Sequence, residues 1–155
     1  MSTKIETSVE INAPVYKVRK FILDYTNHSN WNPVFVNIEK YTNKDVDELV
    51  VGDQLKIDVQ DQATTSTMSI YPKVTVNNFE QFSWKGRLLT KRLFYWIHSF
   101  KYESLNRGTK TKLIHKEEFG GYLTSLLNWI GIIERIELSF DEMNEALKNE
   151  IEMLE

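Results

Sequence analysis

Two histidines and one glutamate are the side chains best suited to acid–base chemistry in this sequence. His98 and His115 are two of its three histidines, and Glu117 follows His115 by two residues. An imidazole exchanges a proton near neutral pH, and a carboxylate can fix its tautomer. Two histidines and one carboxylate can also bind some metal ions. Three roles are therefore open: a hydrogen-bonded polar core, a site that orients a ligand, and a metal site.

A predicted hairpin brings these residues together. The sequence Leu-Asn-Arg-Gly at positions 105–108 is typical of a tight β-turn, because glycine readily adopts a positive φ. With the two middle residues at the tip, counting back pairs His98 with His115 and Trp96 with Glu117. All four side chains then share one face of the sheet. A change of two residues in register would keep that face and alter only the neighbours.

The predicted ligand site combines this polar cluster with apolar side chains from other elements. Small-molecule sites are largely apolar, with a few polar groups that orient the ligand. We expect the ligand-binding residues to be Trp84, Trp96, His98, Phe100, Leu113, His115, Glu117, Leu126, Trp129, Ile130 and Ile133. The candidates for catalysis are His98, His115 and Glu117. We expect neither a metal nor a cofactor, because nothing in the sequence enforces a coordination geometry.

Alternation of apolar and polar residues predicts the sheet that positions this site. Residues 4–11 alternate, and the pattern returns in six further runs after Pro33. Such alternation is typical of antiparallel strands with one buried and one solvated face. Between the first two strands, Asn12-Ala13-Pro14 and the apolar residues that follow predict two short helices.

The segment 122–155 predicts a long C-terminal helix that covers the sheet. Its second half carries an apolar stripe at Ile136, Phe140, Met143, Leu147, Ile151 and Leu154. This spacing is typical of an amphipathic helix. The first half is apolar on most sides, so we expect it to be buried on more than one side. Gly131 predicts either a bend in the helix or space for a closely packed group.

Length and composition exclude several classes of protein. A chain of 155 residues without an internal repeat is most simply a single domain, 1–155. The sequence has no cysteine, which excludes disulfides, thiolate catalysis and cysteine-ligated metal sites. No apolar run suits a signal peptide or a membrane span. We therefore expect a soluble cytoplasmic protein without integral membrane association.

A basic band suggests a second kind of function. Bases outnumber acids between positions 85 and 116, where Glu103 is the only acidic residue. The band comprises Lys85, Arg87, Lys91, Arg92, Lys101, Lys110, Lys112 and Lys116, which fall mainly on the outward face of the sheet. They could contact RNA, an anionic membrane or an acidic protein partner, or could simply be a solvated surface. The aromatic side chains point inward and cannot stack on bases, so no nucleic acid is expected.

Four short motifs and the order of elements resemble a known superfamily. The motifs are Asn12-Ala13-Pro14, Trp31-Asn32-Pro33, Arg107-Gly108-Thr109 and Phe119-Gly120-Gly121. They resemble the START-like helix-grip (SRPBCC) superfamily, in particular its polyketide cyclase/dehydrase and lipid-transport-like branch. The resemblance implies an α+β fold in which a bent seven-stranded antiparallel sheet wraps around the C-terminal helix. An apolar cavity is expected between sheet and helix.

The resemblance implies a binding function more strongly than a catalytic one. We expect the protein to bind a hydrophobic or aromatic small molecule, such as a lipid or a polyketide-like compound, without catalysis. The alternatives are a cyclase/aromatase-like enzyme and a module that binds a protein partner through the basic face. A monomer or weak dimer is expected. Fold alone does not decide among these functions.

Overall fold

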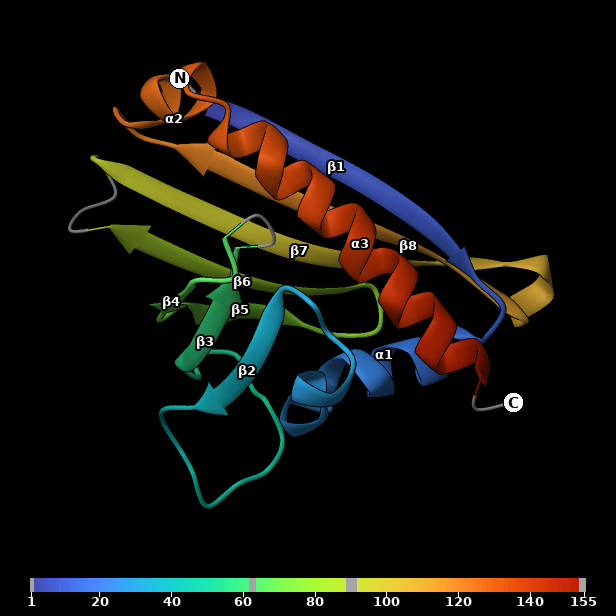
Figure 1. Cartoon of the computed structure of the whole chain (residues 1–155). Coiled ribbons are helices and arrows are strands. Elements are labelled where there is room, and N and C mark those ends of the chain that lie inside the picture. The colour runs from blue at the N-terminus through green and yellow to red at the C-terminus, as the bar shows by residue number, and fades with distance from the viewer. Residues whose placement is uncertain (1, 62–63, 89–91, 154–155) are drawn as a thin grey trace.

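The computed structural model describes residues 2–61, 64–88 and 92–153. A curved antiparallel sheet forms one layer, and a long C-terminal helix lies diagonally across its inner face (Figure 1). The predicted α+β arrangement of a sheet around a helix is confirmed. Lys91 of the basic band and Leu154 of the apolar stripe lie outside the described residues.

The helices and strands follow the predicted order. The strands are β1 (Ser2–Ile11), β2 (Phe35–Lys40), β3 (Leu55–Gln60), β4 (Thr67–Ile70), β5 (Lys73–Asn77), β6 (Gln81–Leu88), β7 (Phe94–Leu105) and β8 (Lys110–Gly120). The helices are α1 (Val15–Leu23), α2 (Thr124–Trp129) and α3 (Ile132–Met153), with 3₁₀ turns η1 (Tyr25–Asn30) and η2 (Asn106–Gly108). The two short helices predicted after the first strand correspond to α1 and η1.

The strands form two sheets that meet at a corner. One sheet has the order β1-β8-β7-β6-β5, and the other has the order β2-β3-β4. An isolated bridge between Gln54 and Lys73 connects them. Two backbone hydrogen bonds, from Leu55 N–H to Pro72 and from Val74 N–H to Asp53, add to this junction. The large sheet therefore curves into the small one, and both face the same interior.

The predicted count of seven strands differs by one from the eight strands of the described residues. The run from Met68 to Val76, predicted as one strand, is divided at Tyr71 and Pro72 into β4 and β5. Proline has no N–H to donate to a strand ladder, so it favours a break or an edge position. The break coincides with the corner between the two sheets.

The predicted register of the β7–β8 hairpin is wrong by two residues. His98 pairs with Glu117, and His115 pairs with Phe100. The cause is the turn: Leu105 pairs with Lys110, and η2 fills the loop between them. Residues 106–109 therefore form the loop, which is two residues longer than the predicted turn. The predicted inward face is unchanged, because a shift of two preserves the alternation.

The C-terminal segment forms two helices rather than one. Gly131 has a φ of 83° and separates α2 from α3, so the bend predicted there is confirmed. A Cβ at this position would meet nothing within 4 Å, which contradicts the alternative that glycine makes room for a packed group. The predicted burial of the first half is also wrong, since Trp129 of α2 is 84% exposed. Within the described residues, no helix is long and apolar enough to cross a membrane.

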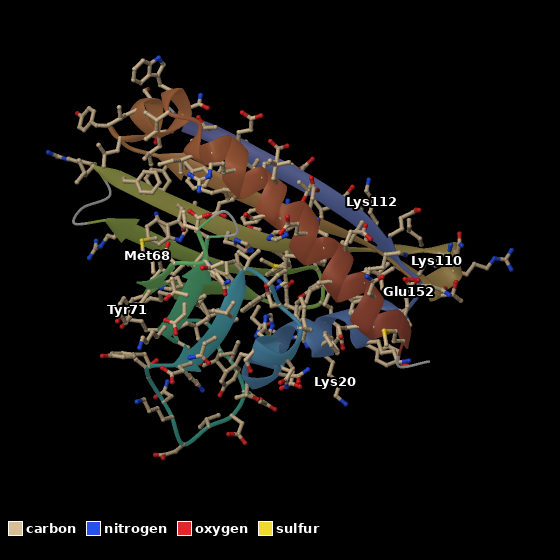
Figure 2. All side chains as sticks on the ribbon, viewed as in Figure 1. Lys20, Met68, Tyr71, Lys110, Lys112 and Glu152 are labelled. Carbon is tan, nitrogen blue, oxygen red and sulfur yellow. The ribbon has the colours of Figure 1, made fainter. Side chains whose placement is uncertain are left out.

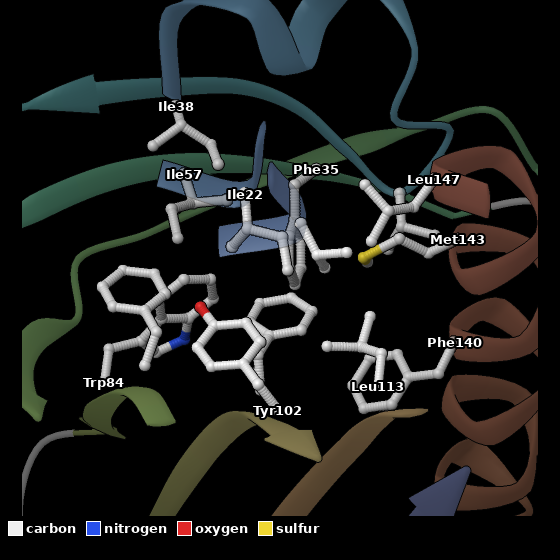
Figure 3. Close-up of a cluster of buried hydrophobic side chains, with 14 of the residues drawn as sticks. Ile22, Phe35, Ile38, Ile57, Trp84, Tyr102, Leu113, Phe140, Met143 and Leu147 are labelled. Carbon is white, nitrogen blue, oxygen red and sulfur yellow. The ribbon is translucent and has the colours of Figure 1, made fainter. Parts of the chain in front are cut away.

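The core lies between the sheet, α1 and α3. Phe140, Met143 and Leu147 extend from α3 toward Ile22 of α1 and Ile57 of β3 (Figure 3). Their spacing of three and four residues places them on one side of α3, as the apolar stripe predicts. These contacts hold α3 against the sheet along its C-terminal half. Its N-terminal half is left to cover a cavity.

Candidate functional site

A cavity of about 560 Å³ lies between the two sheets and the N-terminal half of α3. Its walls are mainly apolar. Strands β6, β7 and β8 contribute Trp84, Phe94, Trp96, His98, Glu117 and Phe119, the small sheet contributes Phe35, Val59 and Ile70, and the helices contribute Leu127, Ile132, Ile133, Ile136 and Phe140. A volume of this size can hold a drug-sized or lipid-like molecule.

One side of the cavity carries a polar and exposed rim. Asp61 and Arg135 form an ion pair at 2.6 Å, which links the end of β3 to α3. Ser139 also lines this side. Met68 on β4 is 65% exposed and lies at the outer edge of the small sheet (Figure 2). The exposed part of the cavity lining therefore lies on β4, on α3 and beside the end of β3.

The structure divides the eleven predicted ligand-binding residues into three groups. Trp84, Trp96, His98, Glu117 and Ile133 line the cavity. Phe100, Leu113 and His115 are buried but do not line it. Leu126, Trp129 and Ile130 are largely exposed on and after α2, away from the cavity lining. Their apolar spacing suggested burial, but the break at Gly131 turns α2 outward.

Several lining residues escaped the sequence analysis. Phe35 is buried in the wall because a β-bulge between Phe35 and Asn37 shifts the alternation of β2. The sequence pattern instead favoured Val36, which is only half-buried. Phe140 also lines the cavity. It belongs to the predicted apolar stripe and lies in the N-terminal half of α3, and this position could have identified it as a lining residue.

Five polar side chains form a hydrogen-bonded series that begins at the cavity. Glu117 Oε2 lies 3.2 Å from His98 Nδ1, and His98 Nε2 lies 2.9 Å from His115 Nε2. His115 Nδ1 lies 2.9 Å from Asn144 Oδ1 of α3, and Asn144 Nδ2 donates to Thr7 Oγ1 of β1 at 2.8 Å. We call these five residues the hydrogen-bond relay. The sequence predicted its first three members but neither Asn144 nor Thr7.

Aromatic rings hold both imidazoles in place. The His98 ring stacks on Trp84 with ring centroids 4.6 Å apart, and the His115 ring stacks on Phe140 at 4.0 Å. The ring of Phe100 also stacks on the His115 ring, with ring centroids 4.6 Å apart. Packing on this scale fixes ring orientation and excludes water. The relay is therefore ordered by its surroundings as well as by its hydrogen bonds.

Burial favours the neutral form of each titratable group in the relay. It raises the pKa of Glu117 to about 8 and lowers the pKa of His98 to about 3. Burial, together with the neighbouring His98, lowers the pKa of His115 well below 6.5, although the hydrogen bond that His115 Nδ1 donates to Asn144 Oδ1 opposes this. A carboxyl group that stays protonated near neutral pH is unusual and often marks a functional site.

The three groups do not converge as metal ligands would. They follow one another in a line, in which each side chain hydrogen-bonds the next. Among residues 2–61, 64–88 and 92–153, no group of three or more His, Cys, Asp or Glu side chains could hold a metal ion. The arrangement instead suits proton transfer or the orientation of a ligand at its cavity end.

The outward face of the large sheet has mixed charge. The basic residues of β6 to β8 are on this face, as predicted, but β1 adds acids beside them. Glu6 pairs with Lys116, and Glu10 pairs with Lys112, across the β1–β8 ladder. Lys112 also lies 4.0 Å from Glu103. Figure 2 marks Lys110 and Lys112 at the hairpin end. Interspersed acids weaken any net attraction for an acidic partner.

Comparison with solved structures identifies the fold. The chain is similar to the ZhuI aromatase/cyclase from Streptomyces sp. R1128, with a TM-score of 0.76, 13% identity and coverage of 98% of this chain and 94% of that one. It is also similar to a START superfamily protein from Mycobacterium smegmatis, with a TM-score of 0.75, 16% identity and coverage of 98% and 99%.

A third similarity is to a two-domain protein. The chain matches the di-domain aromatase/cyclase StfQ of the steffimycin biosynthetic pathway with a TM-score of 0.74 and 9% identity, covering 99% of this chain and 51% of that one. No family model matches the sequence, and no curated protein matches it. The agreement over nearly the whole length, at such low identity, concerns the backbone. The chain therefore adopts the START-like helix-grip fold predicted from its motifs.

Proposed function

We propose that this protein binds a hydrophobic or aromatic small molecule, of lipid or polyketide-like size, in the cavity between the sheet and α3. The observation that carries the proposal is the cavity itself, about 560 Å³ with apolar walls and the carboxyl group of Glu117 among them. Protein interiors are normally packed without voids of this size. A space that is kept open, rimmed by polar side chains and connected to the surface is typical of a ligand site.

The energetics of an apolar ligand support useful affinity without an ion pair. Burial of apolar surface contributes about 25 cal/mol per Å², before the costs of association are subtracted. A ring system that buries a few hundred Å² could thus reach micromolar affinity. Trp84 and Trp96 contribute aromatic surface to the cavity wall. Two of the structural neighbours are named aromatase/cyclases, which is consistent with an aromatic ligand.

Titration with a panel of ring compounds and lipids tests the proposal. Flavonoids, sterols, fatty acids and polyketide aromatics should be added to the purified protein, with tryptophan emission and calorimetry as readouts. At least one class should bind more tightly than about 100 μM, and the emission change should persist in Trp129→Phe, because Trp129 is exposed. The proposal fails if no compound binds at that level.

A matched pair of variants on α3 locates the binding. Ile136→Phe enlarges a side chain that lines the cavity, whereas Leu138→Phe makes the same addition at a position that is 61% exposed. The first should weaken ligand binding by about tenfold or more, and the second should leave it unchanged. Equal binding by both variants would place the ligand outside the cavity.

A cyclase-type reaction is the second candidate, and the observation that favours it is the acid at the cavity wall. A carboxyl group with a pKa of about 8 can exchange a proton near neutral pH, here through the His98 that its Oε2 contacts. Turnover of a linear poly-β-ketone into a cyclic product, abolished in Glu117→Leu while binding persists, would support this function. Binding without any turnover would leave the protein as a non-catalytic ligand carrier.

A further inference from the structure

The hydrogen-bond relay has a direction, and its far end sets it. The amide Nδ2 of Asn144 donates to Thr7 Oγ1 at 2.8 Å, so the other amide atom, Oδ1, faces His115 Nδ1. An amide oxygen only accepts hydrogen bonds. In this orientation of the amide, His115 carries its proton on Nδ1. Asn144 lies on α3 and Thr7 on β1, so the helix and the first strand together hold the amide at the far end of the relay.

The positions of the protons on His98 and Glu117 then follow from that of the proton on His115. A neutral His115 with a proton on Nδ1 has a lone pair on Nε2, so it accepts from His98 Nε2, 2.9 Å away. A neutral His98 with a proton on Nε2 has a lone pair on Nδ1, which faces Glu117 Oε2 at 3.2 Å. Two lone pairs cannot form a hydrogen bond. With His98 neutral, Glu117 Oε2 therefore carries a proton and donates it to His98. An ion pair between a His98 imidazolium and a Glu117 carboxylate would satisfy the same contact, but burial of both groups disfavours it.

We infer that Asn144, held by Thr7, keeps Glu117 in the neutral acid form, and that the free oxygen of this acid selects neutral ligands carrying a hydroxyl group. Glu117 is the member of the relay that reaches the cavity with an unused atom. Among the described residues nothing hydrogen-bonds its Oε1, and its side chain retains 10% exposure. This oxygen can accept a hydrogen bond from a ligand hydroxyl but has no proton of its own to donate. The inference rests on the proposed ligand-binding function.

The surroundings of Glu117 contain no charge that would favour its ionised form. From β7 it faces His98, from β1 it pairs with Ile5, and α3 presents Ile133, Ile136 and Phe140 to the same space. The charged lining residues are Asp61 and Arg135, which are paired with each other at the rim. The neighbouring Lys116 and Glu118 alternate to the opposite face of β8. Burial then raises the pKa of Glu117 to about 8.

The reversed relay is the alternative that an experiment must exclude. With the Asn144 amide turned around, every donor would become an acceptor, His98 would carry its proton on Nδ1, and Glu117 would be an anion. Nitrogen-15 NMR of the histidine rings distinguishes the two tautomers in the protein without ligand. At pH 7 we expect His98 protonated on Nε2 and His115 protonated on Nδ1. The opposite tautomers, or a His98 ring protonated on both nitrogens, would overturn the inference.

Variants at the ends of the relay sharpen this measurement. In Glu117→Gln the side-chain amide can donate to His98 Nδ1 as the acid does, so both tautomers should be retained. Asn144→Asp places a negative charge beside His115, which favours protonation of both its nitrogens. His115 Nε2 would then donate, and His98 should change to the Nδ1-protonated form. If Asn144→Asp does not fold, Thr7→Val tests the same link, because it should yield a mixture of tautomers. Unchanged tautomers in the variants that fold would overturn the role of Asn144.

Three ligands of one shape test the selectivity at pH 7. These are 2-naphthol, 2-methylnaphthalene and the ammonium form of 2-(aminomethyl)naphthalene, compared by calorimetry with wild-type protein and Glu117→Gln. The naphthol should bind about tenfold more tightly than the methyl compound, as one added hydrogen bond allows, and the ammonium compound should bind most weakly. Tightest binding of the ammonium compound would show an ionised Glu117 and overturn the inference. If 2-naphthol and 2-methylnaphthalene bind equally well, the proposed selectivity of Glu117 for hydroxyl groups is overturned, while the proposed binding of ring compounds in the cavity is supported. If no ring compound binds, both proposals fail together.

Discussion

The structure shifts the pKa values of two buried carboxyl groups in opposite directions. Asp53 is fully buried where the two sheets meet, yet it is ionised: it lies 3.2 Å from Lys40 Nζ and accepts hydrogen bonds from the Val50 backbone and the Asn43 side chain. Burial acts to raise the pKa of Asp53, but these donors and the charge of Lys40 together lower it below its ordinary value. Glu117 is similarly buried and has one imidazole as its partner.

The comparison shows that charge depends on what surrounds a buried carboxyl rather than on its depth. Asp53 is surrounded by donors, and Lys40 itself donates to the backbone carbonyls of Val46 and Glu48. A fully satisfied ion pair of this kind holds structure in place. Glu117 has an unused oxygen in an apolar cavity, so its proton is retained. The first arrangement closes a corner of the fold, and the second leaves a carboxyl oxygen without a partner among the described residues at the wall of the cavity.

The largest expected effect comes from breaking the ion pair. Lys40→Met leaves the Asp53 carboxylate buried without its counter-charge, so we expect the free energy of unfolding to fall by roughly 3–5 kcal/mol. Urea denaturation at pH 7 measures this. Lys20→Met is the control, because Lys20 is an exposed lysine on α1 (Figure 2), and it should change stability by less than about 0.5 kcal/mol. Similar small effects in both variants would contradict the structural role of the pair.

The pH dependence of stability should separate the two carboxyl groups. The folded chain retains the Glu117 proton up to a pKa of about 8, whereas the unfolded chain releases it near 4.5, so Glu117 makes stability fall as pH rises between these values. The neutral buried histidines act oppositely: their stabilisation is present above the unfolded pKa of 6.5 and is lost as pH falls through the lowered folded values. Above pH 6.5 the effect of Glu117 remains.

We therefore expect the stability of the wild type, relative to that of Glu117→Gln, to fall by roughly 2 kcal/mol between pH 6.5 and pH 8. Glu117→Gln cannot ionise and keeps the buried histidines, so the rise in stability that these histidines still contribute just above pH 6.5 is common to both proteins and cancels in the difference. Urea denaturation of both proteins at matched pH values is the measurement. Parallel curves for the two proteins would mean that Glu117 is already ionised at pH 6.5, and that it resembles Asp53 after all.

The smallest effect is expected at the far end of the relay. Thr7→Val removes a neutral hydrogen bond to Asn144 and keeps the shape of the side chain, so the expected loss is about 1 kcal/mol. Thr3→Val on the same face of β1 is a control and should cost less than about 0.5 kcal/mol. Thermal unfolding can resolve this difference. A loss from Thr7→Val as large as that from Lys40→Met would remove the distinction between charged and neutral networks.

The sequence predicted the strands well because their burial is one-sided. Along β8, Leu113, His115 and Glu117 alternate with half-buried residues, and this period of two is legible in one sequence. The register of β7 against β8 was not legible, since it depends on backbone angles at Asn106 and Arg107 that residue types do not dictate. The same face was predicted, but with different neighbours.

The parts of the site that escaped prediction depend on contacts between distant segments. Asn144 contacts His115 only because α3 crosses β8 at that point. Its neighbours in the sequence do not indicate that it forms a hydrogen bond to a distant strand. Lys40 ends a strand and would normally be exposed. Trp129 shows the converse error: apolar residues around Gly131 suggested burial, whereas the backbone turn leaves this side chain in solvent.

The pairing of β1 with β8 has a consequence for how the chain folds. Ile11 lies opposite Thr111 and Ser2 lies opposite Gly120, so β1 has no sheet partner until β8, the last of the described strands, has been made. Contacts so far apart in sequence slow folding, because a long loop must close before they form. The hairpins β5–β6–β7–β8 join neighbours along the chain and can assemble first. We expect β1 and α3, which hold Thr7 and Asn144, to dock last, so the relay is completed only in the final step of folding.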